Sequence, residues 1–300
     1  MSRILSLVGV TIVVAGVMAP RSALSQATAD DHAADGHSHA NAPVSCTTLA
    51  SPPWMGLPEL DREQIAALRL EMSALNTPEA ARAAGFNPVL GDIPGMGVHY
   101  VNMLRNMDGV HIDAPDHLMF STIDGQEQLV GAAYAFIDAP DTDEPVPFQS
   151  DLATWHDHPQ FADQGRTLHM LHIWFVPSSN GPFAGLNFWL PYRTAGIEPP
   201  SSCWMADPAD AERIQTVSFA LVPPRQPAAA DRFAERQAAR GDMLSALDAA
   251  ARAVDHDAWV AAADRFLSDL NDAERTAVQR LLGVLNDAQM STAQREEIRN

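Results

Sequence analysis

The chain contains no lysine: its 19 basic residues are all arginine and stand against 38 acidic residues, which gives a formal net charge of −19. The absence of lysine excludes Schiff-base and pyridoxal-type chemistry, and with them the phosphate-binding lysine of a Walker A loop. A surface of this sign repels phosphate backbones and anionic lipids, so we expect no nucleic-acid partner and no peripheral membrane binding.

Cysteine is also scarce, since only Cys46 and Cys203 are present, and a cysteine-only zinc site is therefore excluded. The chain also lacks a Gly-x-Ser-x-Gly elbow, a glycine-rich phosphate loop and a Cys-x-x-Cys-His haem site. In an oxidising compartment we expect the two cysteines to form a disulfide, the alternative being two buried free thiols.

The first 25 residues have the pattern of a secretory signal peptide. Arg3 precedes an uncharged apolar run of 16 residues, Ile4 to Ala19, and small residues follow at Ala23-Leu24-Ser25. A membrane-spanning helix needs about 20 apolar residues, so we predict export to a periplasm or beyond, with no membrane association once the leader is removed.

Composition divides the remaining chain into three parts. Residues 26–58 are predicted to be a disordered arm; its first part, 26–45, is polar, Ala-rich and acidic, and His32, His37 and His39 there could collect metal ions from solution. Residues 59–224 predict a β-rich main domain with a short N-terminal helix pair. Residues 229–300 predict a helical C-terminal segment, which packs either on its own sheet or on a protein partner. The predicted fold class is α+β.

Short apolar runs separated by Gly, Pro, Asn and Asp predict an antiparallel sheet, a sandwich or a small barrel. The runs cover 98–104, 117–123, 129–137, 167–176, 185–190 and 216–222. Helix starts are predicted at Asp61 (with Gln64), at Thr77-Pro78, at Asn271 (with Glu274) and at Ser291 (with Gln294).

Histidine is frequent, and seven of the 11 histidines lie between residues 99 and 172. In Trp155-His156-Asp157-His158 the two imidazoles stand two residues apart. On an extended chain they point to the same side and Asp157 points to the other, which suits a strand that supplies two metal ligands. A polar loop is the alternative interpretation, because Pro159 follows directly.

The other histidines differ in their setting. His169 and His172 are three residues apart in a predicted strand, so they face opposite sides. His99 lies in an extended, apolar segment, where a single histidine is more often a hydrogen-bonded core residue than a ligand. His111 and His117 flank Asp113, Pro115 and Asp116, and we expect them in a surface loop.

Together these patterns predict a transition-metal site formed by His156, His158 and one or two of His99, His172 and His169. The favoured set is His99, His156, His158 and His172, with Cu or Zn as the metal and Fe as a further possibility. A closed four-ligand site indicates metal storage or a structural metal, and three ligands with an open position indicate a metal-dependent oxidoreductase. Methionines in the same domain hint at a softer metal, although methionine more often fills gaps in a core. The remaining alternative is a ligand-binding or interaction module without metal.

Five short segments between residues 60 and 190 carry a resemblance to a known family: 97–102, 115–120, 128–134, 171–174 and 180–187. Their order resembles that in an uncharacterised family of secreted bacterial proteins with G-x-H-Y and L-H-x-W motifs. The resemblance implies no activity, but it singles out His99 and His172 as the motif histidines. The chain departs from the family at Ala133, where the family has Glu.

Overall fold

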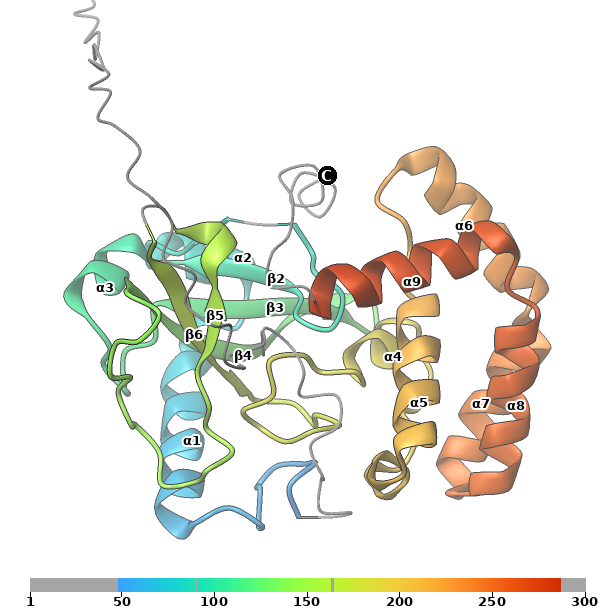
Figure 1. Ribbon diagram of the computed structural model, residues 1–300, viewed down its shortest axis with the longest axis horizontal. Helices are drawn as coiled ribbons and strands as arrows, with labels where there is room; N and C mark the ends of the chain where they lie inside the picture. Colours follow the sequence, from blue (N-terminus) through green and yellow to red (C-terminus); the bar gives the residue numbers. More distant parts are fainter. Residues whose placement is uncertain (1–47, 90, 163–164, 287–300) are drawn as a thin grey trace, which may run out of the picture. The chain divides into compact units, whose positions relative to one another are not determined.

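A six-stranded antiparallel sheet is the central element of the computed structural model, which describes residues 48–89, 91–162 and 165–286 (Figure 1). The strand order is β1-β2-β3-β4-β6-β5, so β5 lies at an edge of the sheet. The strands are β1 (Asn87–Pro88), β2 (Val98–Val101), β3 (His117–Ile123), β4 (Gln126–Asp138), β5 (His156–His158) and β6 (Thr167–Trp174). The predicted α+β class and antiparallel sheet are confirmed.

One face of the sheet is covered by the N-terminal helices α1 (Glu59–Met72) and α2 (Pro78–Ala83), with the short 3-10 helix η2 (Ser73–Leu75) between them. Apolar residues recur along α1 at helical spacing and pack against alternate residues of the strands. The buried members of this core include Ile65, Leu68 and Met72 from α1 and Leu118, Tyr134, Leu171 and Ile173 from the sheet. This face is therefore an ordinary helix-on-sheet core.

The opposite face carries a different set of side chains. Cross-strand partners share a face, and the register aligns His117 with Ala133 and Ala133 with His172. The same alternation brings His99 of β2 and both histidines of β5 to this side. Small residues of β4, Gly131, Ala133 and Ala135, lie between the histidines.

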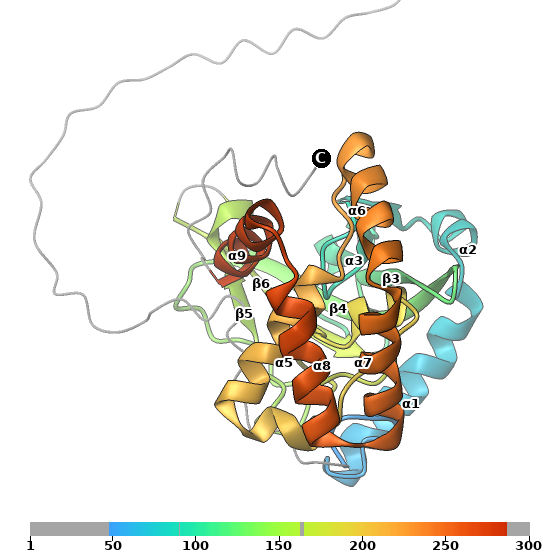
Figure 2. The same ribbon diagram turned by 90° about the vertical axis from the view of Figure 1, so that its right-hand side faces the viewer.

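Two short helices interrupt the strands: α3 (Met103–Asp108) lies between β2 and β3, and the 3-10 helix η3 (Pro159–Phe161) lies between β5 and β6. After β6 the regular elements of the described residues are helical: α4 (Leu190–Thr194), the 3-10 helix η4 (Ser202–Ala206), α5 (Pro208–Ala220), α6 (Pro227–Ala239), α7 (Gly241–Ala253), α8 (His256–Ser268) and α9 (Asp272–Asn286). Figures 1 and 2 show α7 and α8 side by side. Their core also contains Ile93, Met96 and Leu186, so the C-terminal helices pack on the chain's own main domain.

Two predicted strands are wrong. Residues 216–222 belong mostly to α5, which begins with Pro208 after Asp207, whose carboxylate accepts a hydrogen bond from the Ala209 N–H at 2.8 Å. Val217 and Phe219 are buried in the helical core, and this burial outweighs their strand propensity. Of the predicted strand 185–190, residues 185–189 form a buried loop and Leu190 begins α4.

Of the helix starts predicted within the described residues, two are confirmed and one is wrong. Thr77 and Asn271 cap their helices as expected, and Asn271 forms a complete capping box with Glu274. Asp61 is not an N-cap, because α1 begins two residues earlier. Its buried carboxylate accepts the N–H groups of Gln149 and Ser150 instead, both at 2.8 Å, and so holds a loop distant in the sequence.

The described residues contain no disulfide: Cys203 carries a free, partly buried thiol, and Cys46, its predicted partner, lies outside them. Cys46, the signal peptide, the arm up to residue 47 and the capping box at Ser291 lie outside the described residues. Within the part of the chain that is described, no helix has the length and apolar character needed to cross a membrane.

Candidate metal centre

The four histidines predicted as ligands form one connected series of ring contacts. The ring centroids of His99 and His172 are 5.5 Å apart, those of His172 and His156 are 4.8 Å apart, and those of His156 and His158 are 4.9 Å apart. All four residues are buried, and His172 is fully so. We refer to His99, His156, His158 and His172 as the imidazole cluster; their role as metal ligands stays a prediction.

The sheet order alone does not place these rings together. Strands β2 and β6 are separated by β3 and β4, which corresponds to roughly 14 Å between their backbones in a flat sheet. The His99 and His172 rings approach each other across this gap, where β4 presents the small residues Gly131, Ala133 and Ala135 on the same face. A Cβ added at Gly131 would lie 2.5 Å from the Ile173 carbonyl oxygen, so this position has no room even for alanine.

Neighbouring ring pairs of the cluster are spaced much as two ligands of one metal would be. Two imidazoles bound to one tetrahedral metal, with nitrogen-to-metal distances of about 2.0–2.1 Å, have ring centroids roughly 5 Å apart, and the three neighbouring pairs are 4.8 to 5.5 Å apart. Among the described residues, the group of three whose ligand atoms all lie within 4.8 Å of one another is not in this cluster but is the second group described below.

The tautomer of His172 follows from one hydrogen bond. Its Nδ1 lies 2.9 Å from the Gly185 carbonyl oxygen, and because a carbonyl can only accept, Nδ1 is the donor. The neutral ring therefore carries its lone pair on Nε2. A hydrogen bond of this kind on the second nitrogen is what orients metal-binding histidines in proteins.

The expectation that His117 lies in a surface loop is wrong. His117 is the first residue of β3, it is buried, and its ring centroid is 6.1 Å from that of His99. Its Nδ1 lies 3.1 Å from a carboxylate oxygen of Asp116, and Asp116 is held by the backbone N–H of Ala135. The acidic, proline-containing segment before His117 obscured the start of the strand. His111 is exposed, as expected.

The five methionines of the main domain that could supply a softer ligand lie in three different places. Met119 and Met170 are buried on the same face as the cluster, where Met119 is the cross-strand partner of His99 and Met170 that of His156. Met103 and Met107 are exposed on α3, and Met96 belongs to the helical core. Only the first two therefore lie on the strand face that carries the imidazoles.

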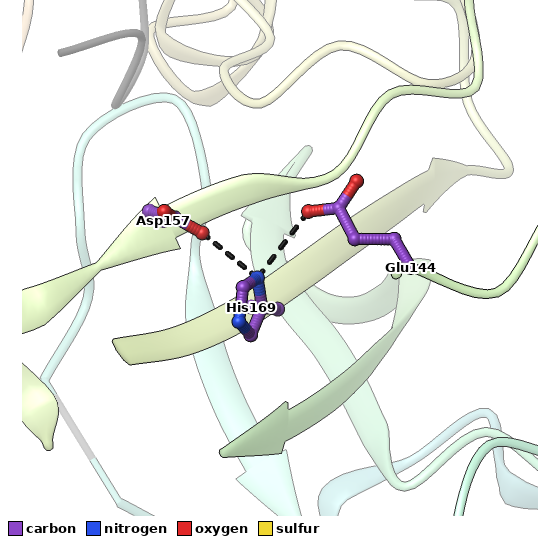
Figure 3. Close-up of side chains that lie close together, drawn as sticks. All are labelled: Glu144, Asp157 and His169. Carbon is purple, nitrogen blue, oxygen red and sulfur yellow. Dashed lines mark hydrogen bonds and ion pairs between the residues drawn. The ribbon is translucent and has the colours of Figure 1, made fainter. Parts of the chain in front are cut away.

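A second group lies on the other side of the same two strands and could hold a metal ion. It consists of Glu144, Asp157 and His169, whose potential ligand atoms all lie within 4.8 Å of one another (Figure 3). His169 Nδ1 is 2.9 Å from Asp157 Oδ1 and 3.2 Å from Glu144 Oε1. His169 is fully buried, whereas the two carboxylates are partly exposed to solvent.

The surroundings of this second group restrict its protonation. His169 Nε2 lies 3.1 Å from the Ala139 carbonyl oxygen and must donate to it. Burial raises the pKa of Glu144 and that of Asp157, and the hydrogen bonds and charge of His169 partly offset this. Phe136 stacks on the imidazole with ring centroids 4.6 Å apart, which fixes the orientation of the ring.

Sequence reasoning placed Asp157 and His169 correctly on the face opposite the cluster but did not pair them. Their pairing follows from the β5–β6 register, which the sequence does not specify. Glu144 comes from the irregular segment between β4 and β5, and nothing in its sequence context distinguishes it from the neighbouring acidic residues.

Comparison of the chain with protein-family models, with curated proteins and with solved structures found no match. The function is therefore inferred from the geometry of the two histidine-containing groups.

Proposed function

We propose that this chain is an exported protein that binds a transition-metal ion, Cu or Zn, through the imidazole cluster. The observation that carries the proposal is the connected series of four buried rings from three strands, with centroid separations of 4.8–5.5 Å. Neutral imidazole is a borderline ligand that suits these metals.

Two further features support a metal site over a set of core histidines. A core histidine needs only local hydrogen-bond partners, and it has no reason to contact other imidazoles. Here β4 provides small residues where the rings gather, and β2, β5 and β6 supply the histidines. The Gly185 carbonyl also leaves the His172 lone pair on Nε2.

Export forms part of the same proposal and rests on the N-terminal pattern of Arg3 followed by an apolar run. Mass spectrometry of the protein recovered from a periplasmic fraction tests it, because cleavage removes about 25 residues. Recovery of the intact N-terminus in the cytoplasm would contradict export without affecting the metal proposal.

Elemental analysis of the purified chain tests the metal site. We expect about one equivalent of Cu or Zn in the unaltered protein and a large loss in His158→Ala and in His172→Ala. His111→Ala is the matched control, since it removes an exposed imidazole outside the cluster. Equal metal content in all four proteins would refute the proposal, as would its absence from the unaltered chain after incubation with Cu(II) and with Zn(II).

A further inference from the structure

The group Glu144, Asp157 and His169 brings together side chains from three segments that are separate in the sequence. Asp157 lies on the edge strand β5, His169 on β6, and Glu144 in the segment between β4 and β5. Strand β5 has only three residues and pairs with β6 alone. The contacts of Asp157 and Glu144 with His169 thus join this edge strand and the preceding segment to β6.

The donor set differs from that of the imidazole cluster. Two carboxylates and one imidazole suit a divalent cation with mixed nitrogen and oxygen preference, such as Zn²⁺ or Mn²⁺. Because His169 Nε2 donates to Ala139, Nδ1 is the ring atom that faces both carboxylates. Without a cation Nδ1 carries the proton of these hydrogen bonds, and a cation would displace this proton to solvent and bind the lone pair left on Nδ1. The Ala139 carbonyl accepts a hydrogen bond from Nε2, the ring nitrogen that would not bind the metal, as is usual for metal-binding histidines.

The space between the ligand atoms is close to what a cation needs. Ligands at about 2.0–2.2 Å from a tetrahedral metal are roughly 3.3 Å apart. The Nδ1-to-oxygen distances are 2.9 and 3.2 Å, so a cation requires these atoms to separate by only a few tenths of an ångström. The side chains of Glu144 and Asp157 are 37% and 40% exposed, which provides an entry path and room for a water ligand.

We propose that Glu144, Asp157 and His169 form a second cation site, and that the bound divalent cation clamps the segment before β5 and strand β5 itself onto β6. The site is independent of metal binding by the imidazole cluster. It has a consequence for the cluster, because the strand it fixes also carries His156 and His158 on its other face. A cation at Asp157 would hold both imidazoles in position.

Titration with Mn²⁺, followed by electron paramagnetic resonance, tests the second site in a chain whose cluster has been removed. The His99→Ala/His172→Ala variant serves this purpose, because it leaves β5, Asp157 and His169 unaltered. We expect one saturable Mn²⁺ site per chain. Asp157→Asn added to this variant should raise the Kd at least ~10-fold, as loss of a direct ligand costs no less than loss of an outer-shell partner.

Asp143→Asn in the same background is the matched control, since it removes one negative charge from an exposed residue beside Glu144 and should leave the Kd unchanged. The clamp is tested separately by hydrogen exchange, which should slow in residues 144–158 when Mn²⁺ is added and should not slow in the Asp157→Asn variant. If the background variant does not fold, the same two substitutions in the unaltered chain repeat the comparison.

Three outcomes overturn the proposal: no saturable binding of Mn²⁺, the same Kd for Asp157→Asn and Asp143→Asn, or binding without any change in hydrogen exchange. Either of the first two outcomes would mean that Glu144, Asp157 and His169 form a hydrogen-bonded ion pair and bind no cation. Failure of the imidazole cluster to bind Cu or Zn gives a different result, because it leaves the Mn²⁺ titration of the cluster-free variant unaffected.

Discussion

Asp157 of β5 and His169 of β6 are direct cross-strand partners, and their side chains meet at 2.9 Å on the face of the sheet opposite the imidazole cluster. His156 and His158, on either side of Asp157, turn to the cluster face. Two strands that together span few residues thus supply side chains to two chemically different groups. Because successive side chains of a β-strand point to opposite faces, the two groups lie on opposite sides of the sheet although both include residues of the edge strand β5.

Gly131→Ala should destabilise the fold without removing any proposed ligand. The new Cβ would lie 2.5 Å from the Ile173 carbonyl oxygen and 2.5 Å from Met119 Cε, so β4 and β6 must move apart. Overpacking of this kind costs about 1–3 kcal/mol. Urea unfolding measures the loss, with Gly241→Ala as the control because an added Cβ there meets no atom within 4 Å. Equal stability of the two variants would contradict the packing described for β4.

Asp61→Ala should loosen the segment that carries Glu144. The buried Asp61 carboxylate accepts two backbone N–H groups, those of Gln149 and Ser150, and removing it leaves both donors without this acceptor. We expect a loss of roughly 2–3 kcal/mol in the free energy of unfolding. Hydrogen exchange at residues 149 and 150 should also accelerate. Glu63→Ala, an exposed acidic residue on the same helix, should change neither quantity.

Glu274 should contribute stability that is lost only in strong acid. Burial alone would raise the pKa of Glu274, but hydrogen bonds from Arg240, from the Asn271 backbone and from Arg236 outweigh this effect and lower it to about 2. A lowered pKa means that the contribution, on the order of 3 kcal/mol, is complete above about pH 4.5 and disappears as the pH falls through about 2.

The matching experiment compares the unaltered chain with Glu274→Gln by chemical denaturation at a series of pH values. The difference in unfolding free energy should be constant near neutral pH and should shrink below about pH 4.5. Asp272→Asn, which changes an exposed acid in the first turn of the same helix, should show a much smaller difference. A pH-independent difference for Glu274→Gln would argue against the ion pair as its source.

His256 should give a pH dependence of the opposite sign. The hydrogen bond from its Nε2 to Asp210, 2.6 Å long, is the main reason that the pKa of His256 is raised. The resulting stability is present in full below about pH 6.5 and is lost as the pH rises through the raised value. The imidazole is 43% exposed, so we expect less than about 1 kcal/mol. Denaturation of His256→Gln at pH 5.5 and pH 8.5 measures it, and the same difference at both pH values would disprove the coupling.

Period-two alternation was enough to separate the histidines by face. It placed His156 and His158 on one side of a strand with Asp157 on the other, and it separated His169 from His172, as the β5–β6 register confirms. Helix caps were readable where both partners lie within one turn, as at Asn271 and Glu274. These features are local, so a few neighbouring residues determine them.

The tertiary structure decided everything that depends on which strands pair and in which register. The approach of His99 to His172 across two intervening strands requires the small residues of β4, and the pairing of Asp157 with His169 requires a particular register. Burial in the helical core turned 216–222 into a helix against its strand propensity, and Glu144 reached His169 through an irregular segment. Such contacts join residues far apart in the chain, and their energies exceed the local preferences that a sequence pattern records.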